Sequence, residues 1–269
     1  MVSRRVVRRR RRVLVGALLG LALGGVLALR GGDERAPAPA APATPAVAAP
    51  ATAPPVGDGE GSPEPQPSPS PREEPAASPD ALAGVLSAEV PDAGTGRLLT
   101  VPGTRAPAVE PAGADVVQVR VQVEEGLPAD GAAVAGTVMD VLQDPRGWGP
   151  DGWAFARTDD AEGAEEADVT VVVASPDLTD RLCAPLRTGG VLSCRNGDRA
   201  VLTWYRWVNG AEGYGEDRAG YRQYLVSHEV GHFLGHGHDP CSAPGEPAPV
   251  MLQQTKGLQG CTPNPWPHP

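Results

Sequence analysis

Four of the five histidines of this 269-residue chain lie in one short window, which reads HEVGHFLGHGH from residue 228 to residue 238. On a helix, His228 and His232 project from the same face about 6 Å apart, so both imidazoles can bind one metal ion. Glu229 points about 100° away around the helix, which keeps its carboxylate off the metal. It can instead reach a metal-bound water as a general base.

The third metal ligand requires the chain to turn. His236 continues the spacing of four, but three histidines along one straight helix would span about 12 Å, too far for a single ion. Gly235 can adopt the left-handed backbone that ends a helix and redirects the chain. We therefore expect His228, His232 and His238 to bind the metal, and the ring of His236 to face solvent or lie behind the ligands. The alternative exchanges the roles of His236 and His238. Three neutral imidazoles leave a fourth position for water, as in catalytic zinc sites.

The complete spacing, HExxHxxGxxH, resembles the zinc-binding pattern of the metzincin peptidases. The resemblance covers about residues 110–260. It implies an α+β fold with a twisted, mixed and mostly parallel sheet, an active-site helix and a short C-terminal subdomain. It also implies one catalytic Zn²⁺ and a peptide or protein substrate. The alternative is a helix with incidental histidines.

Residues beyond the histidines resemble further features of that family. Met251, thirteen residues after His238, is similar to the methionine of the Met-turn that supports the zinc from below; a core-filling role is the alternative. Asp239 follows the third histidine as in the snake-venom-like branch. With Gly235 it is expected to orient the turn or a ligand. The chain departs from the family in having no tyrosine after the methionine and only eighteen further residues, so residues 252–258 are expected to form the S1′ wall.

Two segments before the histidine motif, VRVQVEEGLP and DPRGW, resemble an exported actinobacterial domain family of uncharacterised function. The recognised features of that family are the same zinc motif and an N-terminal membrane segment. The resemblance supports the class of protein and gives no substrate.

The first third of the chain predicts export followed by a spacer. Residues 1–12 contain seven arginines, and residues 13–29 are uncharged and apolar. This order predicts a transmembrane anchor or the hydrophobic region of a cleaved signal peptide, with the rest of the chain outside the cell. Residues 30–84 are rich in proline and alanine, which predicts an extended linker without a core. Residues 85–269 are then the peptidase domain of a single-pass membrane protein or a secreted protein.

The charge of the chain excludes one class of partner. The formal net charge is −10, and the seven arginines of residues 1–12 contribute +7, so the rest of the chain carries −17. A domain this acidic is a poor binder of nucleic acid. We expect a monomer that contacts the membrane through its N-terminal segment only.

Four cysteines occur in the predicted exported domain, at positions 183, 194, 241 and 261. An even number in an oxidising compartment predicts two disulfides, for which three connectivities exist. We expect the local pairs Cys183–Cys194 and Cys241–Cys261. The alternative, a cysteine–zinc site, lacks any CxxC spacing.

Hydrophobic periodicity predicts, in order, a strand, a helix, two strands, a hairpin and the zinc helix. The predicted ranges are 115–124, 130–144, 153–157, 167–174, 191–194 paired with 199–207, and 218–234. The hairpin is expected to turn at Asn196-Gly197. An acidic run at 159–168 predicts a solvated loop, with a calcium site as the alternative.

These features favour an extracytoplasmic zinc-dependent endopeptidase. An extended substrate is expected to lie antiparallel to an edge strand within residues 199–207. Trp204, Tyr205 and Trp207 in that segment are either packing residues or substrate contacts. One alternative function is a non-catalytic, zinc-stabilised binding module of the cell envelope, against which the intact Glu229 argues. Another is a zinc amidase that acts on peptidoglycan peptides, which only the location suggests.

Overall fold

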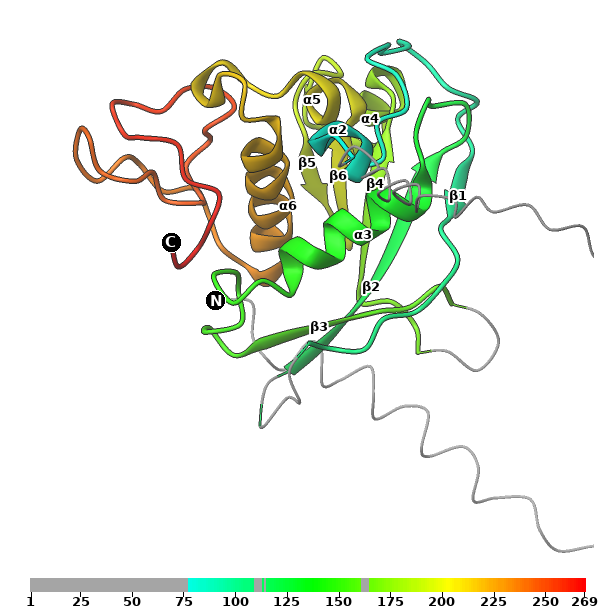
Figure 1. Cartoon of the computed structure of the whole chain (residues 1–269), viewed down its shortest axis with the longest axis horizontal. Helices are drawn as coiled ribbons and strands as arrows, with labels where there is room; N and C mark the ends of the chain where they lie inside the picture. The colour runs from blue at the N-terminus through cyan, green and yellow to red at the C-terminus, as the bar shows by residue number, and fades with distance from the viewer. Residues whose placement is uncertain (1–76, 109–112, 114, 161–164) are drawn as a thin grey trace, which may run out of the picture. The chain divides into compact units, whose positions relative to one another are not determined.

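The computed structural model describes residues 77–108, 113, 115–160 and 165–269 (Figure 1). The expected basic arm, the apolar segment 13–29 and most of the expected linker lie outside these residues, as does part of the acidic run. Within the described ranges no helix combines the length and the apolar character needed to cross a membrane.

Six strands form one mixed sheet, which confirms the expected α+β class with a partly parallel sheet. The strands are β1 (Leu98–Thr100), β2 (Asp115–Glu124), β3 (Trp153–Arg157), β4 (Val169–Ala174), β5 (Cys194–Asn196) and β6 (Arg199–Thr203). Their order is β1-β2-β4-β6-β5, with β3 also paired to β2. β3, β4 and β6 continue the sheet in parallel, whereas β1 and β5 are antiparallel to their neighbours. β5 therefore forms one edge of the sheet.

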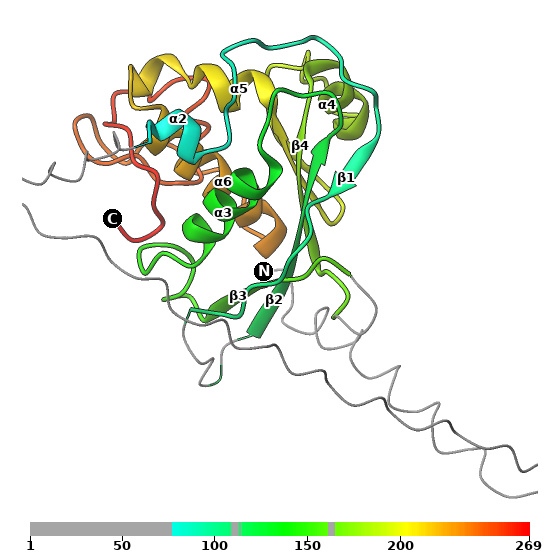
Figure 2. The same ribbon diagram turned by 45° about the vertical axis from the view of Figure 1, so that its right-hand side comes forward.

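Helices cover both faces of this sheet (Figure 2). They are α2 (Pro79–Leu82), α3 (Gly131–Leu142), α4 (Pro176–Cys183), α5 (Trp204–Asn209) and α6 (Arg218–Leu234), with a short 3₁₀ turn, η1 (Glu212–Tyr214). Strand β4 shows the layering because all of its side chains are buried. Val171 and Val173 join the main core with residues of α3 and α6, whereas Val172 and Ala174 pack with residues of α4 on the opposite face.

The predicted helices at 130–144 and 218–234 are both present, as α3 and α6. Asp130 caps α3, its carboxylate accepting from the backbone N–H groups of Ala132 and Ala133. Asp217 caps α6 in the same way through the N–H of Gly220. An acidic cap satisfies amide groups that the first turn of a helix leaves free.

Helix α4 was not predicted, although its sequence signals are plain. Ser175 caps it by accepting from the N–H of Leu178, and Pro176 occupies its first turn. A serine followed by proline is a common way to begin a helix, because proline needs no hydrogen-bond acceptor there.

The predicted hairpin is present, but two of its details are wrong. Asn196 pairs with Arg199, so the turn consists of Gly197 and Asp198 rather than Asn196-Gly197. Gly197 has a φ of 64°, which glycine adopts without steric cost. The second strand ends at Thr203 instead of Trp207.

Residues 204–209 form α5 where a strand was expected. Trp204 and Trp207 are three residues apart, a helical spacing, and both side chains are fully buried. Their indole N–H groups donate to the carbonyls of Glu89 and Ala83, 3.2 and 3.0 Å away. These tryptophans are therefore packing residues that hold the N-terminal segment of the domain.

The folded domain begins before residue 85, earlier than the sequence indicated. Asp80 in α2 forms an ion pair with Arg222 of α6, with 2.6 Å between Oδ1 and Nη2. Arg222 is 1% exposed, and its Nε donates to the carbonyl of Trp207. Within the stretch assigned to the linker, α2 therefore supplies the counter-charge for a buried guanidinium on the histidine-bearing helix.

Replacing Asp80 with alanine is expected to lower the free energy of unfolding by about 2–3 kcal/mol, because Arg222 is left buried without its carboxylate. Denaturant unfolding measures this loss. Asp140→Ala is the matched control, since Asp140 and its partner Arg105 are both exposed. The control should cost less than about 1 kcal/mol. Equal losses in the two variants would show that burial of the Asp80 pair has no energetic weight.

Candidate metal centre

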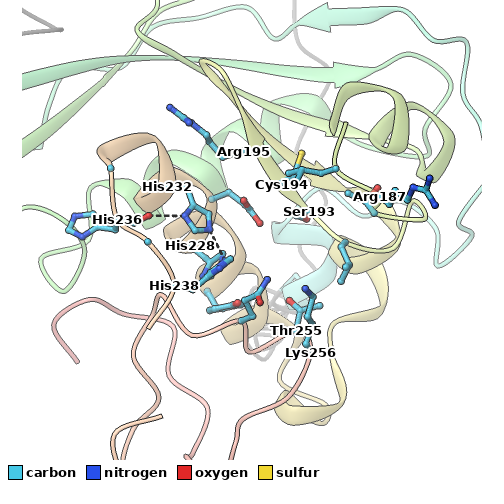
Figure 3. Close-up of a pocket in the computed structure, with 18 residues that line it drawn as sticks. Arg187, Ser193, Cys194, Arg195, His228, His232, His236, His238, Thr255 and Lys256 are labelled. Carbon is cyan, nitrogen blue, oxygen red and sulfur yellow. Dashed lines mark hydrogen bonds between the residues drawn. The ribbon is translucent and has the colours of Figure 1, made fainter. Parts of the chain in front are cut away.

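Three histidines converge at the C-terminal end of α6 (Figure 3). His228 and His232 lie on the helix, and His238 lies on the segment that follows it. One ring nitrogen from each falls within 4.8 Å of the others. The Nε2 atoms of His232 and His238 are 3.1 Å apart. These are the three residues that the motif predicted.

Backbone carbonyls fix the orientation of the two helical imidazoles. Nδ1 of His228 donates to the carbonyl of Val250, and Nδ1 of His232 donates to the carbonyl of His236, each at 2.8 Å. Because a carbonyl oxygen only accepts, the proton of each ring is on Nδ1. The lone pair of each Nε2 is then available, as metal-binding histidines require.

Gly235 ends the helix and turns the chain toward the site, as predicted. It has a φ of 103°, in the left-handed region. Its N–H donates to the carbonyl of His232, and the N–H of His236 donates to that of Gly231, at 3.2 and 3.0 Å. This is the pair of bonds of a Schellman motif, which glycine favours. The turn brings His238 back to the other two histidines.

The ring of His236 is not part of the group, also as predicted. It stacks on Trp148 with 4.4 Å between ring centroids, and Figure 3 shows it directed away from the other histidines. Nε1 of Trp148 donates to the carbonyl of Ser227 on the helix. The hydrogen bond from His236 to the histidine group is therefore made by its main-chain carbonyl and not by its ring. Nothing in the sequence predicted the contact with Trp148.

Met251 lies directly beneath the helix. It is buried in a turn closed by the N–H of Leu252 and the carbonyl of Pro249. Its own carbonyl accepts from the backbone N–H of Asp239, the residue after the third histidine. A Cβ atom on Gly231 would lie 2.6 Å from the sulfur of Met251. The turn therefore contacts both the helix and the segment that carries His238.

Two tyrosines of α6 attach the C-terminal segment to the helix, a role that the sequence did not predict for them. The hydroxyl of Tyr224 donates a hydrogen bond to the carbonyl of Leu252. The hydroxyls of Tyr221 and Thr255 are hydrogen-bonded to each other at 2.8 Å. Tyr224 and Tyr221 precede His228 by four and seven residues, a spacing that places all three on one helix face. That spacing was the available signal.

Glu229 is buried beside the histidines. Its side chain is 4% exposed, and its Oε2 has no hydrogen-bond partner among the described residues. Burial raises the pKa of this carboxyl to about 8. An orphaned carboxylate oxygen in a polar site requires a ligand, water or ion as its partner.

The histidines are held in the neutral form that binds metals. Desolvation by burial lowers the pKa of His228 to about 3. Burial is also the largest cause of the lowered pKa values of His232 and His238, and the charges of Arg195 and Lys256 act in the same direction on these two rings respectively. Three neutral imidazoles suit a divalent ion such as zinc, copper, iron or nickel.

A cavity of about 560 Å³ opens in front of the histidines. Its walls are the C-terminal half of α6, residues 235–238, residues 186–188, residues 192–195, and residues 253, 255 and 256. The last of these lies within the range 252–258 that was expected to form a pocket wall. The edge strand beside the cavity is β5. The segment 199–207 was expected to supply this edge, but its strand, β6, lies inside the sheet and pairs with β4 and β5. Residues 235–269 contain no helix.

Both expected disulfides are present in the described part of the chain. Cys183–Cys194 joins α4 to the strand β5 that borders the cavity, and Cys241–Cys261 closes the segment after the histidines. All four cysteines are used, which excludes a cysteine metal site. Two disulfides indicate an oxidising, extracytoplasmic environment.

The chain belongs to the family described as "Protein of unknown function (DUF3152)", which matches residues 86–262. This range includes all six strands, the histidine group and both disulfides. Comparison with curated proteins and with solved structures gives no match. No comparison connects the chain to the metzincins, so that resemblance rests on the histidine motif and its geometry.

Replacing His238 with alanine is expected to lower metal affinity more than about 100-fold. Mutating a residue that only hydrogen-bonds to a metal ligand already lowers metal affinity about 10–100-fold, and loss of a ligand should lower it further. His236→Ala is the matched control and should change affinity less than about tenfold, because its carbonyl remains. Titration of the purified chain with Zn²⁺ against a competing chelator measures both. A larger loss of zinc affinity in the His236 variant than in the His238 variant would show that His236 is the third ligand.

Replacing Gly231 with alanine is expected to destabilise the protein by about 1–3 kcal/mol, because the new methyl group overlaps Met251 and Trp148. Gly136→Ala is the matched control on α3, where a Cβ meets no atom within 4 Å. It should stabilise by about 0.5–1 kcal/mol through helix propensity. Thermal unfolding distinguishes the two. A stabilised Gly231 variant would contradict close packing between the helix and the methionine turn.

Proposed function

We propose that this protein is an extracytoplasmic zinc-dependent endopeptidase in which His228, His232 and His238 bind the metal. One observation carries the proposal: Oε2 of the buried Glu229 has no hydrogen-bond partner among the described residues, and the side chain lies beside three imidazoles whose ring nitrogens fall within 4.8 Å of one another. A purely structural site has no use for such a carboxylate.

The choice of zinc rests on the ligands and the compartment. Three neutral imidazoles with one open position are the ligand set of several catalytic zinc sites. Zinc has no redox chemistry, which suits an exported domain cross-linked by disulfides.

Bound zinc would lower the pKa of a water ligand and polarise a substrate carbonyl. Glu229 would take a proton from the attacking water while the oxygen of that water bonds to the carbonyl carbon of the substrate. It would then pass that proton to the amine nitrogen as the peptide C–N bond breaks. Its Oε2 has no hydrogen-bond partner among the described residues, so this oxygen is available to accept that proton.

The substrate would bind as an extra strand along β5. Cys194–Asn196 forms the free edge of the sheet next to the cavity. β5 therefore replaces the segment 199–207, which the sequence predicted as the edge strand that binds the substrate. An antiparallel peptide there would form main-chain hydrogen bonds. Leu186, which is 56% exposed, and Leu192 lie on the same wall and would contact apolar side chains.

Glu229→Gln is expected to lower the rate of peptide-bond hydrolysis by at least about 100-fold, because the amide cannot accept the proton of water. The assay is cleavage of an unstructured protein by the zinc-loaded chain, followed by mass spectrometry of the products. The zinc content should equal that of the unchanged chain, since Glu229 is not a ligand.

Glu246→Gln, an exposed glutamate in the C-terminal segment, is the matched control and should leave the rate unchanged. Full activity in the Glu229 variant would remove this residue from the mechanism. A zinc-loaded chain that cleaves no peptide would favour the non-catalytic binding module.

A further inference from the structure

Basic residues gather at the cavity of an otherwise acidic domain. Over residues 77–269 there are two acidic residues for each basic one. The cavity wall reverses this ratio: Arg187, Arg195 and Lys256 line it, and Glu229 is its only carboxylate among the described residues. Lys256 is also the only lysine of the chain.

The register of the sheet directs Arg195 toward the histidines. Arg195 pairs with Ala200 across the β5–β6 hairpin, so both side chains lie on the same face. Ala200 belongs to the core packed against α6, which places Arg195 on the side of the sheet that carries the histidine helix. Figure 3 shows Arg195 above His232.

Lys256 approaches from the opposite wall. It lies in a turn in which its N–H donates to the carbonyl of Gln253 at 2.9 Å. The preceding residue, Thr255, is bonded to the hydroxyl of Tyr221 on α6. The backbone that carries this ammonium group is therefore fixed relative to the metal ligands, and Figure 3 places it across the cavity from Arg195.

None of the three basic side chains of the cavity forms an ion pair with a described residue. Most other arginines of the domain are paired with carboxylates; these are Arg97, Arg105, Arg120, Arg146, Arg218 and Arg222. Exposed basic groups that stay unpaired among so many acidic residues create a local positive potential, which attracts an anionic ligand. The bound metal ion would add to it.

We propose that the cavity selects peptides with aspartate or glutamate close to the scissile bond, bound by Arg195 on one side and Lys256 on the other. The proposal rests on the proposed peptidase function and names its substrate class. A peptide fits better than an anionic polymer, because the basic groups flank a free strand edge and a buried base. The overall acidity would repel any long polyanion that extends beyond the cavity.

The test is cleavage-site profiling of the zinc-loaded full chain on a proteome-derived peptide library. We expect Asp and Glu to be enriched within two residues of the cleaved bonds. Arg195→Gln and Lys256→Gln should each lower kcat/KM for an acidic peptide about threefold more than kcat/KM for its Asp-to-Asn counterpart, the effect of one exposed ion pair. Charge reversal to glutamate should favour peptides with lysine or arginine instead.

Arg199→Gln is the matched control. Arg199 is an exposed arginine on the same hairpin, does not line the cavity and lies on the face opposite Ala200. It should not change the preference. Efficient cleavage without enrichment of acidic residues would overturn the substrate class and leave the peptidase function standing. No cleavage by the unchanged chain would overturn both.

A binding measurement gives an answer that does not depend on turnover. The zinc-loaded Glu229→Gln chain is titrated with a fluorescent peptide that contains two aspartates and with its asparagine counterpart. We expect the acidic peptide to bind about tenfold more tightly at low salt, and the difference to shrink as salt is added. Equal binding at low salt would overturn the proposal.

Discussion

The geometry of the site depends on one left-handed residue. Without the turn at Gly235, α6 would continue, His236 would follow His232 along the helix axis, and the third imidazole could not reach the other two. The same turn places the carbonyl of His236 against Nδ1 of His232. One backbone conformation therefore both brings the third imidazole to the group and orients the second.

The C-terminal segment supports this arrangement from below. Residues 235–269 have no helix of their own, so their polar backbone is satisfied by side chains and turns. The hydroxyl of Tyr224 binds the carbonyl of Leu252, the carbonyl of Val250 orients His228, and the amide of Gln254 binds the backbone of Asn264. The eighteen residues after the methionine are thereby fastened to the helix without secondary structure.

The sequence predicted the parts of this structure that depend on local spacing. The histidine motif, the glycine turn and the local cysteine pairs were readable because each is fixed by a few neighbouring residues. The helical stretch at Trp204 was misassigned because β-branched and aromatic residues favour strands, and burial in tertiary contacts overrode that preference. The pairing of Asp80 with Arg222 and the stacking of Trp148 on His236 join residues far apart in the chain, which periodicity cannot show.

The disulfide between Cys183 and Cys194 has a mechanical consequence for the free edge of the sheet. A strand of three residues with a neighbour on one side only would fray at little cost in free energy. The cross-link to α4 anchors it covalently, and β6 is its one partner strand in the described sheet. A rigid strand loses less conformational entropy on binding than a flexible one. The edge of β5 is therefore preorganised for a peptide that binds along it.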